Sequence, residues 1–295
     1  MKYVVTGSLG HISKPLVQQL VSAGHSVTVI SSSADREHEI TALGATPAIG
    51  SVTDVTFLTA TFTGADVVYT MVPPTWTASD WKAHIHSVGK NYAVAIKASG
   101  VTKVVNLSSI GAHMPSGCGP VSGLYWVETE LNALDGVDVV HLRPGFFYSN
   151  FLSQLGLIRN MGIMGGNYGV DTTMVLVHTS DIADVAAGFM LNPQFAGKSF
   201  QYISSDECTT SYIAATIGAA IGKPELPWVN FSNEESLNGM LQAGLSNEVA
   251  TNYTEMGTAM ASGEMSADYT QHTPAKGKIS FSDFAKEYAA IYAAQ

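Results

Sequence analysis

Short apolar runs alternate with longer amphipathic patterns through the first half of this 295-residue chain. Runs rich in β-branched residues, such as 66–72 and 102–107, are typical of strands buried on both faces. Stretches such as 14–23 and 81–99 repeat apolar residues every three or four positions, as amphipathic helices do. This alternation predicts an α/β fold with a doubly wound parallel sheet. The predicted strands are 3–6, 26–30, 46–49, 66–72, 102–107, 137–142 and 199–203, and the predicted helices of this half are 14–23, 35–43, 54–61, 81–99 and 124–134.

The pattern after residue 151 is less regular. The glycine-rich segment 161–169 indicates a loop. Segment 234–263 has a helical pattern interrupted by glycines, and segments 181–191, 210–221 and 281–294 are predicted to be helices. This part of the chain therefore does not continue the simple alternation of the first half.

Charge and composition exclude several classes of protein. Hydrophobic residues make up 46% of the chain, and aromatic residues are spread along it, which excludes a disordered chain. No run approaches the roughly 18 apolar residues that a membrane-spanning helix needs. The 14 Lys and Arg residues against 24 Asp and Glu residues leave a net charge of −10, without a basic cluster. We therefore expect neither a membrane nor a nucleic acid as partner.

The cysteines and the N-terminus indicate a cytoplasmic protein. Cys118 and Cys208 lie far apart and form no CxxC pair, so neither a metal site nor a disulfide framework is predicted. Two reduced thiols fit the cytoplasm. The N-terminal residues form a short apolar run that leads directly into a glycine turn, without the features of a targeting signal.

The glycine turn joins the first predicted strand to the first predicted helix. Its spacing is G-x-x-G-x-x-S, with Gly7, Gly10 and Ser13. Gly7 permits a tight turn, Gly10 lets the backbone approach a pyrophosphate, and the helix N-terminus favours the negative charge. The position between a strand and a helix at the start of an α/β chain predicts a dinucleotide site. The alternative is an ordinary strand-to-helix turn. The residues predicted to bind the cofactor here are Gly7, Ser8, Leu9, Gly10, His11 and Ile12.

The end of the second predicted strand indicates which dinucleotide binds. NAD-binding proteins usually carry Asp or Glu there to hold the ribose hydroxyls. This chain has Ser31, Ser32 and Ser33, followed by Arg36. Hydroxyls and a guanidinium suit a 2′-phosphate, so we favour NADP(H) over NAD(H), with Ser31, Ser32 and Arg36 as cofactor-binding residues. In the alternative interpretation, Arg36 is a solvated surface charge.

Several motifs in a fixed order resemble one family. They are segments 6–13 (TGSLGHIS), 66–74 (DVVYTMVPP), 104–109 (VVNLSS), 128–130 (ETE), 142–151 (LRPGFFYSNF) and 178–183 (HTSDIA). Together they resemble the NmrA-like branch of the atypical short-chain dehydrogenases. The resemblance implies a Rossmann domain with a smaller, mostly helical C-terminal substrate domain. We expect the NAD(P)-binding domain at 1–151 and the substrate domain at 152–295, with about 175–205 returning to the Rossmann sheet.

The resemblance also assigns residues to the cofactor cleft. The loop after the fourth strand, with Met71, Val72 and Pro73, is expected to border the cofactor. Ser108, after the fifth strand, is expected near the nicotinamide, and the segment beginning at Pro144 is expected to close over the cleft. All of these residues lie at the carboxyl ends of predicted strands, where open α/β sheets bind their ligands.

One departure from the wider short-chain dehydrogenase group concerns the acid–base pair. That group uses Tyr-x-x-x-Lys, in which the Lys lowers the pKa of the Tyr that supplies a proton. Here Tyr125 is present, but Thr129 stands where the Lys is expected. Tyr125 is the candidate catalytic residue. In the alternative interpretation, Tyr125 is only an aromatic side chain that packs on its helix at the boundary between the domains. Without the Lys, a quinone-type acceptor is favoured over a ketone, because hydride transfer then needs mainly orientation.

The resulting hypothesis is an NADP(H)-dependent oxidoreductase that transfers hydride to a small, fairly apolar electrophile, such as a quinone, a dye or a carbonyl compound. The alternative is an NADP(H)-binding sensor that regulates a protein partner without turnover, which the broken Tyr-Lys pair favours. A nucleotide-sugar epimerase or dehydratase ranks last, because it normally needs both residues of that pair.

Overall fold

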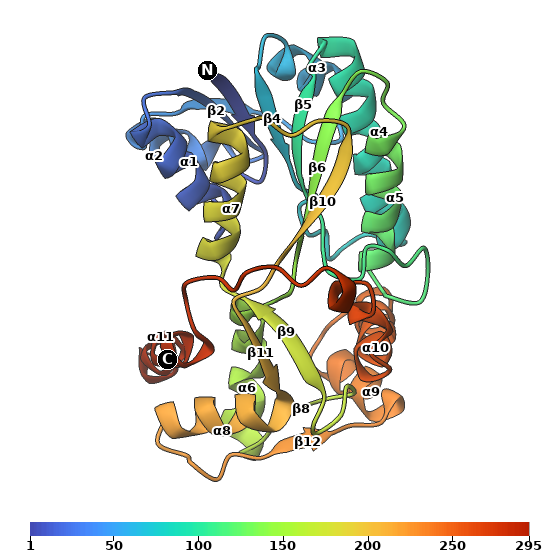
Figure 1. Ribbon diagram of the computed structural model, residues 1–295. Helices are drawn as coiled ribbons and strands as arrows, with labels where there is room; N and C mark the ends of the chain where they lie inside the picture. The colour runs from blue at the N-terminus through green and yellow to red at the C-terminus, as the bar shows by residue number, and fades with distance from the viewer. Residues whose placement is uncertain (295) are drawn as a thin grey trace.

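A seven-stranded parallel sheet forms the centre of the computed structural model, which describes residues 1–294 (Figure 1). Its strand order is β10-β6-β5-β4-β1-β2-β3, so the chain winds outward from β1 in both directions. The doubly wound Rossmann-type sheet expected from the sequence is therefore confirmed. Its strands are β1 (Lys2–Val5), β2 (Ser26–Ser31), β3 (Thr46–Ile49), β4 (Val67–Thr70), β5 (Lys103–Leu107), β6 (Asp138–Pro144) and β10 (Lys198–Ile203).

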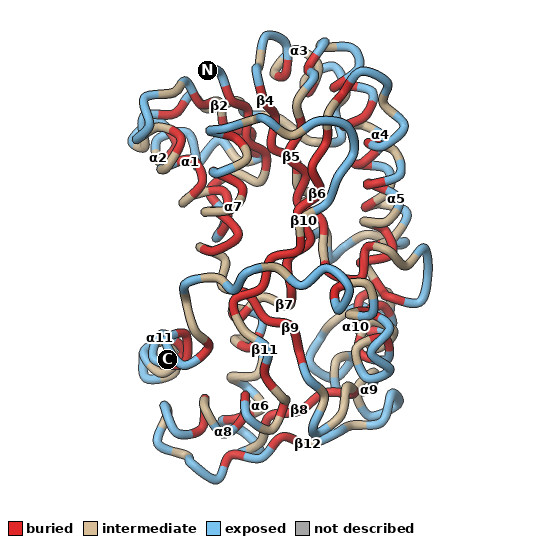
Figure 2. Tube along the Cα trace, viewed as in Figure 1, coloured by how far each residue is buried: buried red, intermediate tan, exposed pale blue. Residues whose placement is uncertain are grey.

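Helices cover both faces of this sheet. Successive strand residues point to opposite faces, so Val5 packs with one set of helices and Val4 with the other. The first set is α1 (Ser13–Ser22), α2 (Glu37–Ala42) and α7 (Thr179–Leu191), and the second is α3 (Val55–Phe62), α4 (Trp81–Ser99) and α5 (Val121–Asn132). Figure 2 shows the central strands β4, β5 and β6 between these layers as buried, whereas the edge strands β3 and β10 are partly exposed.

The remaining elements form the lower half of the molecule in Figure 1. One small sheet has the order β11-β9-β7, and β12 pairs with β8 in another. The strands are β7 (Phe146–Phe147), β8 (Met164–Gly166), β9 (Thr173–Val177), β11 (Asp206–Thr209) and β12 (Trp228–Asn230). The helices are α6 (Leu155–Met161), α8 (Thr210–Ala220), α9 (Asn233–Gln242), α10 (Asn247–Ala261) and α11 (Phe281–Ala294), with 3-10 turns at Ala34–Arg36, Tyr148–Gln154, Glu264–Ser266 and Tyr269–Gln271.

The C-terminal part differs from the sequence expectation in its short strands. The loop expected at 161–169 is wrong over Met164–Gly166, because these residues pair in parallel with Trp228–Asn230. A three-residue strand with two glycines has no alternating pattern that sequence analysis can detect. The interrupted helical segment 234–263 is two helices, α9 and α10, separated at Gly244, whose φ of +90° ends the first helix.

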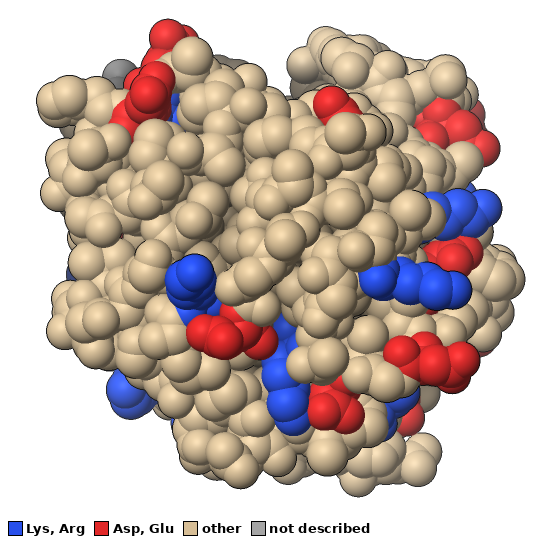
Figure 3. All heavy atoms as spheres, turned by 90° about the horizontal axis from the view of Figure 1, so that it is seen from above, with Lys and Arg blue, Asp and Glu red and all other residues tan. Residues whose placement is uncertain are grey.

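Charged side chains are sparse on the surface, as the composition requires. Viewed from above in Figure 3, one face of the molecule is mostly uncharged, with basic and acidic side chains scattered over it. Within residues 1–294, no helix is both long enough and apolar enough to cross a membrane.

Candidate functional site

The glycine turn between β1 and α1 has the backbone geometry of an anion-binding loop. Gly7 has φ +87° and Ser8 has φ +54°, and Ser8 is the one non-glycine residue among residues 1–294 with positive φ. Two successive residues with positive φ turn the backbone sharply between β1 and α1. A Cβ on Gly7 would lie 2.8 Å from both Met71 Cγ and Ser13 Oγ. Only glycine fits at this position, both for its φ and for its packing.

The turn that leads into α1 leaves backbone donors free. The residue before the helix, Ile12, provides no side-chain cap. Within residues 1–294, the N–H groups of Leu9, His11 and Ile12 have no protein acceptor, while Lys14 N–H donates to the Gly10 carbonyl at 2.9 Å. Uncapped N–H groups and the helix dipole together favour an anion at this position. The structure thus brings the predicted residues of the turn into one anion-binding arrangement.

The end of β4 is held directly against this turn. Met71 N–H donates to Thr6 Oγ1 at 2.8 Å, and the buried Tyr92 hydroxyl donates to the Met71 carbonyl at 2.6 Å. Val72 and Pro73 follow at the same edge and are partly buried. Of the three residues predicted to border the cofactor after the fourth strand, Met71 therefore contacts the glycine turn, and Val72 and Pro73 follow it in the chain.

The serines at the end of β2 have different environments. Ser8 Oγ donates to Ser31 Oγ at 3.0 Å, and Ser31 Oγ donates to the Ser33 carbonyl at 3.2 Å. Ser31 is buried, whereas Ser32 is exposed. The Ser31 hydroxyl therefore fixes the end of β2 against the glycine turn, and Ser32 is the serine of this pair that faces solvent.

Two cations meet one carboxylate near this strand end. Arg36 Nη1 lies 2.7 Å from Glu39 Oε2, and Lys14 Nζ lies 2.8 Å from Glu39 Oε1. Hydrogen bonds from Lys14 and then Arg36 hold the pKa of Glu39 below its usual value. The sequence analysis selected Arg36 but missed Lys14, because only the fold brings the start of α1 beside α2.

Backbone hydrogen bonds join the carboxyl ends of β5 and β6. Ser108 N–H donates to the Leu142 carbonyl at 2.7 Å, and Ile110 N–H donates to the Pro144 carbonyl at 2.8 Å. The Ser108 hydroxyl, which is buried, donates to Glu128 Oε1 at 2.5 Å. Ser108 and Pro144 therefore lie together, and the Ser108 hydroxyl is already engaged by the protein.

A buried ionic network lies behind Ser108, and the sequence analysis did not identify it. Arg143 binds Glu128 through two nitrogens, with Nε–Oε1 at 3.0 Å and Nη2–Oε2 at 2.6 Å. Arg143 Nη1 also donates to Asp268 at 3.1 Å and to the Tyr202 hydroxyl at 3.3 Å, and the guanidinium carbon lies 4.2 Å from the Phe200 ring centre. Burial opposes the charge, but the hydrogen bonds of Glu128 hold the pKa of Arg143 above its usual value. The network joins α5, β6 and β10 to the C-terminal segment.

Tyr125 stands apart from these contacts. Its ring is partly buried and packs edge-on against Trp126, with centroids 5.1 Å apart. Within residues 1–294, its hydroxyl has no hydrogen-bond partner. Thr129 is exposed, and its hydroxyl donates to the Tyr125 carbonyl at 2.9 Å. A catalytic role for Tyr125 therefore stays a prediction, without a neighbouring group that would activate it.

The two cysteines are free thiols within the core. Cys118 and Cys208 are both buried, and burial raises the pKa of each thiol to about 12. Among residues 1–294, no three His, Cys, Asp or Glu side chains are grouped to hold a metal ion.

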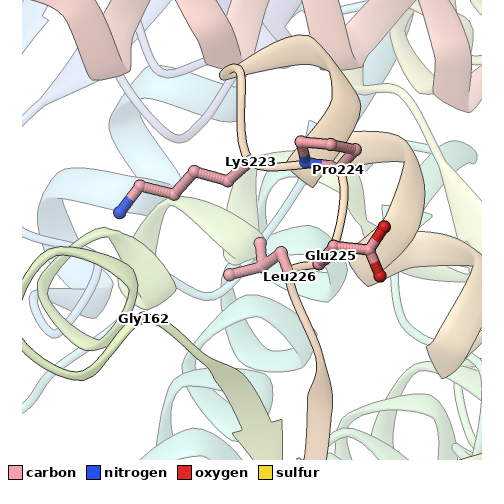
Figure 4. A pocket seen from close by; sticks show the side chains of 5 residues that line it. All are labelled: Gly162, Lys223, Pro224, Glu225 and Leu226. Atoms are coloured by element: carbon pink, nitrogen blue, oxygen red, sulfur yellow. The ribbon is translucent and has the colours of Figure 1, made fainter.

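Two surface cavities lie outside the predicted cofactor residues. One of about 220 Å³ is formed by the end of α6 and the segment between α8 and β12, as Figure 4 shows. The other, of about 350 Å³, lies between the loop after β5 and the segment that follows α10. The first is lined by Gly162, Lys223, Pro224, Glu225 and Leu226, and the second by His113, Met114, Pro115, Ser116, Glu264 and Ala267.

The sequence and the fold are similar to those of known proteins. A (4-alkanoyl-5-oxo-2,5-dihydrofuran-3-yl)methyl phosphate reductase from Streptomyces griseus subsp. griseus is 24% identical over 223 residues, which cover 75% of this chain and 74% of that protein. The structure of NADPH-dependent quinone oxidoreductase QOR2 from Escherichia coli, complexed with NADPH, matches with a TM-score of 0.82 and 18% identity, over 97% of this chain and 99% of that one. Triphenylmethane reductase from Citrobacter sp. matches with a TM-score of 0.79 and 18% identity, over 98% and 99%.

At these identities the two structures establish a shared fold. A family model described as NAD(P)H-binding matches residues 7–193, more than half of the chain, and begins at the first glycine of the turn. The chain therefore belongs to the NAD(P)H-binding family, and the resemblance to NmrA-like short-chain dehydrogenases is confirmed.

Proposed function

We propose that the protein is an NADP(H)-dependent oxidoreductase that reduces a small, fairly apolar electrophile, such as a quinone, a dye or a carbonyl compound. The observation that carries the proposal is the glycine turn, whose left-handed Gly7 and Ser8 precede uncapped N–H groups. The reductases named above support it, since QOR2 is named as an NADPH-dependent quinone oxidoreductase and the Citrobacter protein as a triphenylmethane reductase.

The residues at the carboxyl edge fit a dinucleotide. The free N–H groups of Leu9, His11 and Ile12 suit the pyrophosphate. Backbone N–H groups at a helix N-terminus can bind a phosphate group without a cationic side chain. Met71 and Ser108 end the neighbouring strands β4 and β5, where we place the nicotinamide half. When bound, the cofactor supplies a hydride. The protein's own part is then to orient the acceptor and to exclude water.

Charges near the end of β2 support NADP(H) as the preferred cofactor. Lys14 and Arg36 converge on Glu39, so two cations face one carboxylate. A 2′-phosphate carries nearly two negative charges, which matches this pair of cations better than ribose hydroxyls do. Exposed Ser32 adds a hydroxyl donor at the same strand end. Ser32, Arg36 and Lys14 are therefore the proposed 2′-phosphate ligands.

Cofactor titration tests this preference. We expect NADPH to bind more tightly than NADH, and Arg36→Ala and Lys14→Ala each to reduce the ratio about tenfold, because each removes one charged hydrogen bond. Lys286→Ala is the matched control, since among residues 1–294 Lys286 pairs only with Asp283, on the exposed surface of α11. Equal affinities for the two cofactors in the unmodified protein would refute the preference.

Turnover is tested by following NADPH absorbance with a panel of quinones, dyes and carbonyl compounds. We expect oxidation of NADPH with at least one apolar member of the panel. Tight NADPH binding without oxidation across the panel would overturn the reductase proposal.

The second candidate is a dinucleotide-binding regulator without turnover. The observation that favours it is Tyr125, which lacks an activating partner and is followed by exposed Thr129. This candidate predicts a protein partner whose binding changes with NADP(H). The epimerase or dehydratase alternative ranks last, because the Tyr-Lys pair that such an enzyme normally needs is missing. Two buried, unbridged cysteines support the proposed cytoplasmic location.

A further inference from the structure

An aromatic cluster lies at the start of α4, next to the proposed cofactor site. Trp76 belongs to the segment between β4 and α4, Trp81 is the first residue of α4, and Tyr253 comes from α10. The ring centroids are 5.6 Å apart for Trp76 and Trp81, 5.9 Å for Trp76 and Tyr253, and 5.4 Å for Trp81 and Tyr253. Trp81 is 5% exposed, whereas Trp76 is 50% exposed. We call these three residues the aromatic platform.

The rear of the platform is fixed in place. The backbone N–H of Trp81 donates to Glu248 Oε1 of α10 at 2.8 Å, and the Lys82 ammonium lies 2.8 Å from the Glu255 carboxylate of α10. These contacts hold α10 against the start of α4. Burial raises the pKa of Tyr253 to about 12, so its hydroxyl is neutral at physiological pH. Trp76 therefore packs on two rings that are themselves anchored by two helices.

The platform continues from the residues that contact the glycine turn. Met71 bonds to Thr6 and fills the space that Gly7 leaves open, and Trp76 follows five residues later in the same connecting segment. In a parallel sheet, all the strand-to-helix connections leave from the carboxyl edge. Trp76 is thus an aromatic side chain, half open to solvent, on the edge where the nicotinamide half is proposed to lie.

We propose that Trp76, backed by Trp81 and Tyr253, is the surface on which the ring of the electron acceptor stacks. This inference rests on the proposed function and narrows it to planar aromatic acceptors. An open indole held by neighbouring rings offers a large apolar area with little loss of side-chain freedom on binding. Another aromatic side chain of similar exposure, Tyr212 at 49%, lies on α8, a helix that carries none of the residues assigned to the cofactor or the acceptor.

Equilibrium binding of menadione, a planar naphthoquinone, tests the proposal without turnover. The protein is saturated with NADP⁺, which cannot reduce the quinone, and menadione is added in a calorimetric titration. We expect Trp76→Ala to weaken menadione binding about tenfold, and Trp76→Phe to weaken it less than threefold because a stacking ring remains. Tyr212→Ala is the control of similar exposure, and its menadione affinity should be unchanged.

The NADPH dissociation constant of each variant shows whether the fold and the cofactor site are intact. If that constant is unchanged and menadione binds Trp76→Ala as tightly as the unmodified protein, the proposal is overturned. If menadione binding depends on Trp76 but NADPH is never oxidised, the reductase proposal fails and the stacking surface stands. If NADPH is oxidised and the menadione KM is the same with and without Trp76, the stacking surface fails and the reductase stands.

Discussion

Removing the carboxylate of Glu128 should destabilise the protein more than any surface charge change. Glu128 is 5% exposed and Arg143 is 8% exposed, and they share two hydrogen bonds of 3.0 and 2.6 Å. In Glu128→Met, Arg143 keeps its contact with Asp268 but loses its bidentate partner, and the Ser108 hydroxyl loses its acceptor. A buried charge is then only partly compensated, at a site from which water is largely excluded.

The magnitude follows from these contacts. Breaking a buried ion pair by removing one partner costs about 3–5 kcal/mol. Asp268 still compensates part of the Arg143 charge, which places the expected loss near the lower limit, at about 3 kcal/mol. A loss of this size lowers the melting temperature by at least about 5 °C in a chain of this length.

Urea unfolding of the cofactor-free protein, followed by tryptophan fluorescence and by circular dichroism, measures the loss. Lys286→Ala is the control, because Lys286 and Asp283 form an exposed pair in which the Lys side chain is 78% accessible. This change should alter the free energy of unfolding by less than about 0.5 kcal/mol.

A double variant separates a lost ion pair from a lost side chain. Glu128→Met with Arg143→Met removes both charges, and Asp268 keeps its 2.6 Å hydrogen bond from the Tyr202 hydroxyl. Because paired apolar replacements are often close to neutral, the double variant should be more stable than Glu128→Met alone. A loss below about 1 kcal/mol in the single variant, or additive losses in the double variant, would contradict this reasoning.

Three further predictions concern pH, the turn and the thiols. Burial lowers the pKa of His141 from 6.5 to about 4. The neutral imidazole should therefore contribute its full share to the free energy of unfolding above pH 6.5, and about 3 kcal/mol of it should be lost as the pH falls to 4. In acid unfolding curves, His141→Gln should abolish this loss. Gly7→Ala should abolish NADPH binding in a titration, whereas Gly24→Ala, with φ +81° and open space around it, should leave the affinity unchanged. Cys118 and Cys208 should react with a thiol reagent only when urea unfolds the protein, because both thiols are buried. Fast labelling of the native protein would contradict this prediction.

The parallel sheet and the glycine turn were predictable because their signals are local. A buried strand such as β5 requires a run of apolar residues, and the turn requires glycine at Gly7 because of its φ and its contact with Met71. The short strands of the C-terminal part lacked such signals. For example, β8 contains two glycines and exists only because distant residues Trp228–Asn230 pair with it.

The ionic contacts were harder to predict because they join segments far apart in the chain. Lys14 meets Glu39 only after α1 and α2 pack on the same face, and Asp268 reaches Arg143 from the last third of the sequence. One signal was available for Glu128. It lies four residues after Leu124 and three before Leu131, so a carboxylate occupies the apolar face of the predicted helix. A charge at such a position indicates a buried partner.

A chain with only 13% charged residues nevertheless buries Glu128 and Arg143 together, and stability alone does not explain this choice. A buried ion pair is a weak source of net stability, because desolvation opposes the attraction. What the pair does provide is a fixed orientation for the side chains that it contacts. Glu128 orients the Ser108 hydroxyl at the carboxyl edge of β5, while the other side of Arg143 holds Asp268 in the C-terminal segment. The network therefore fixes the segment after α10 relative to the carboxyl ends of β5 and β6.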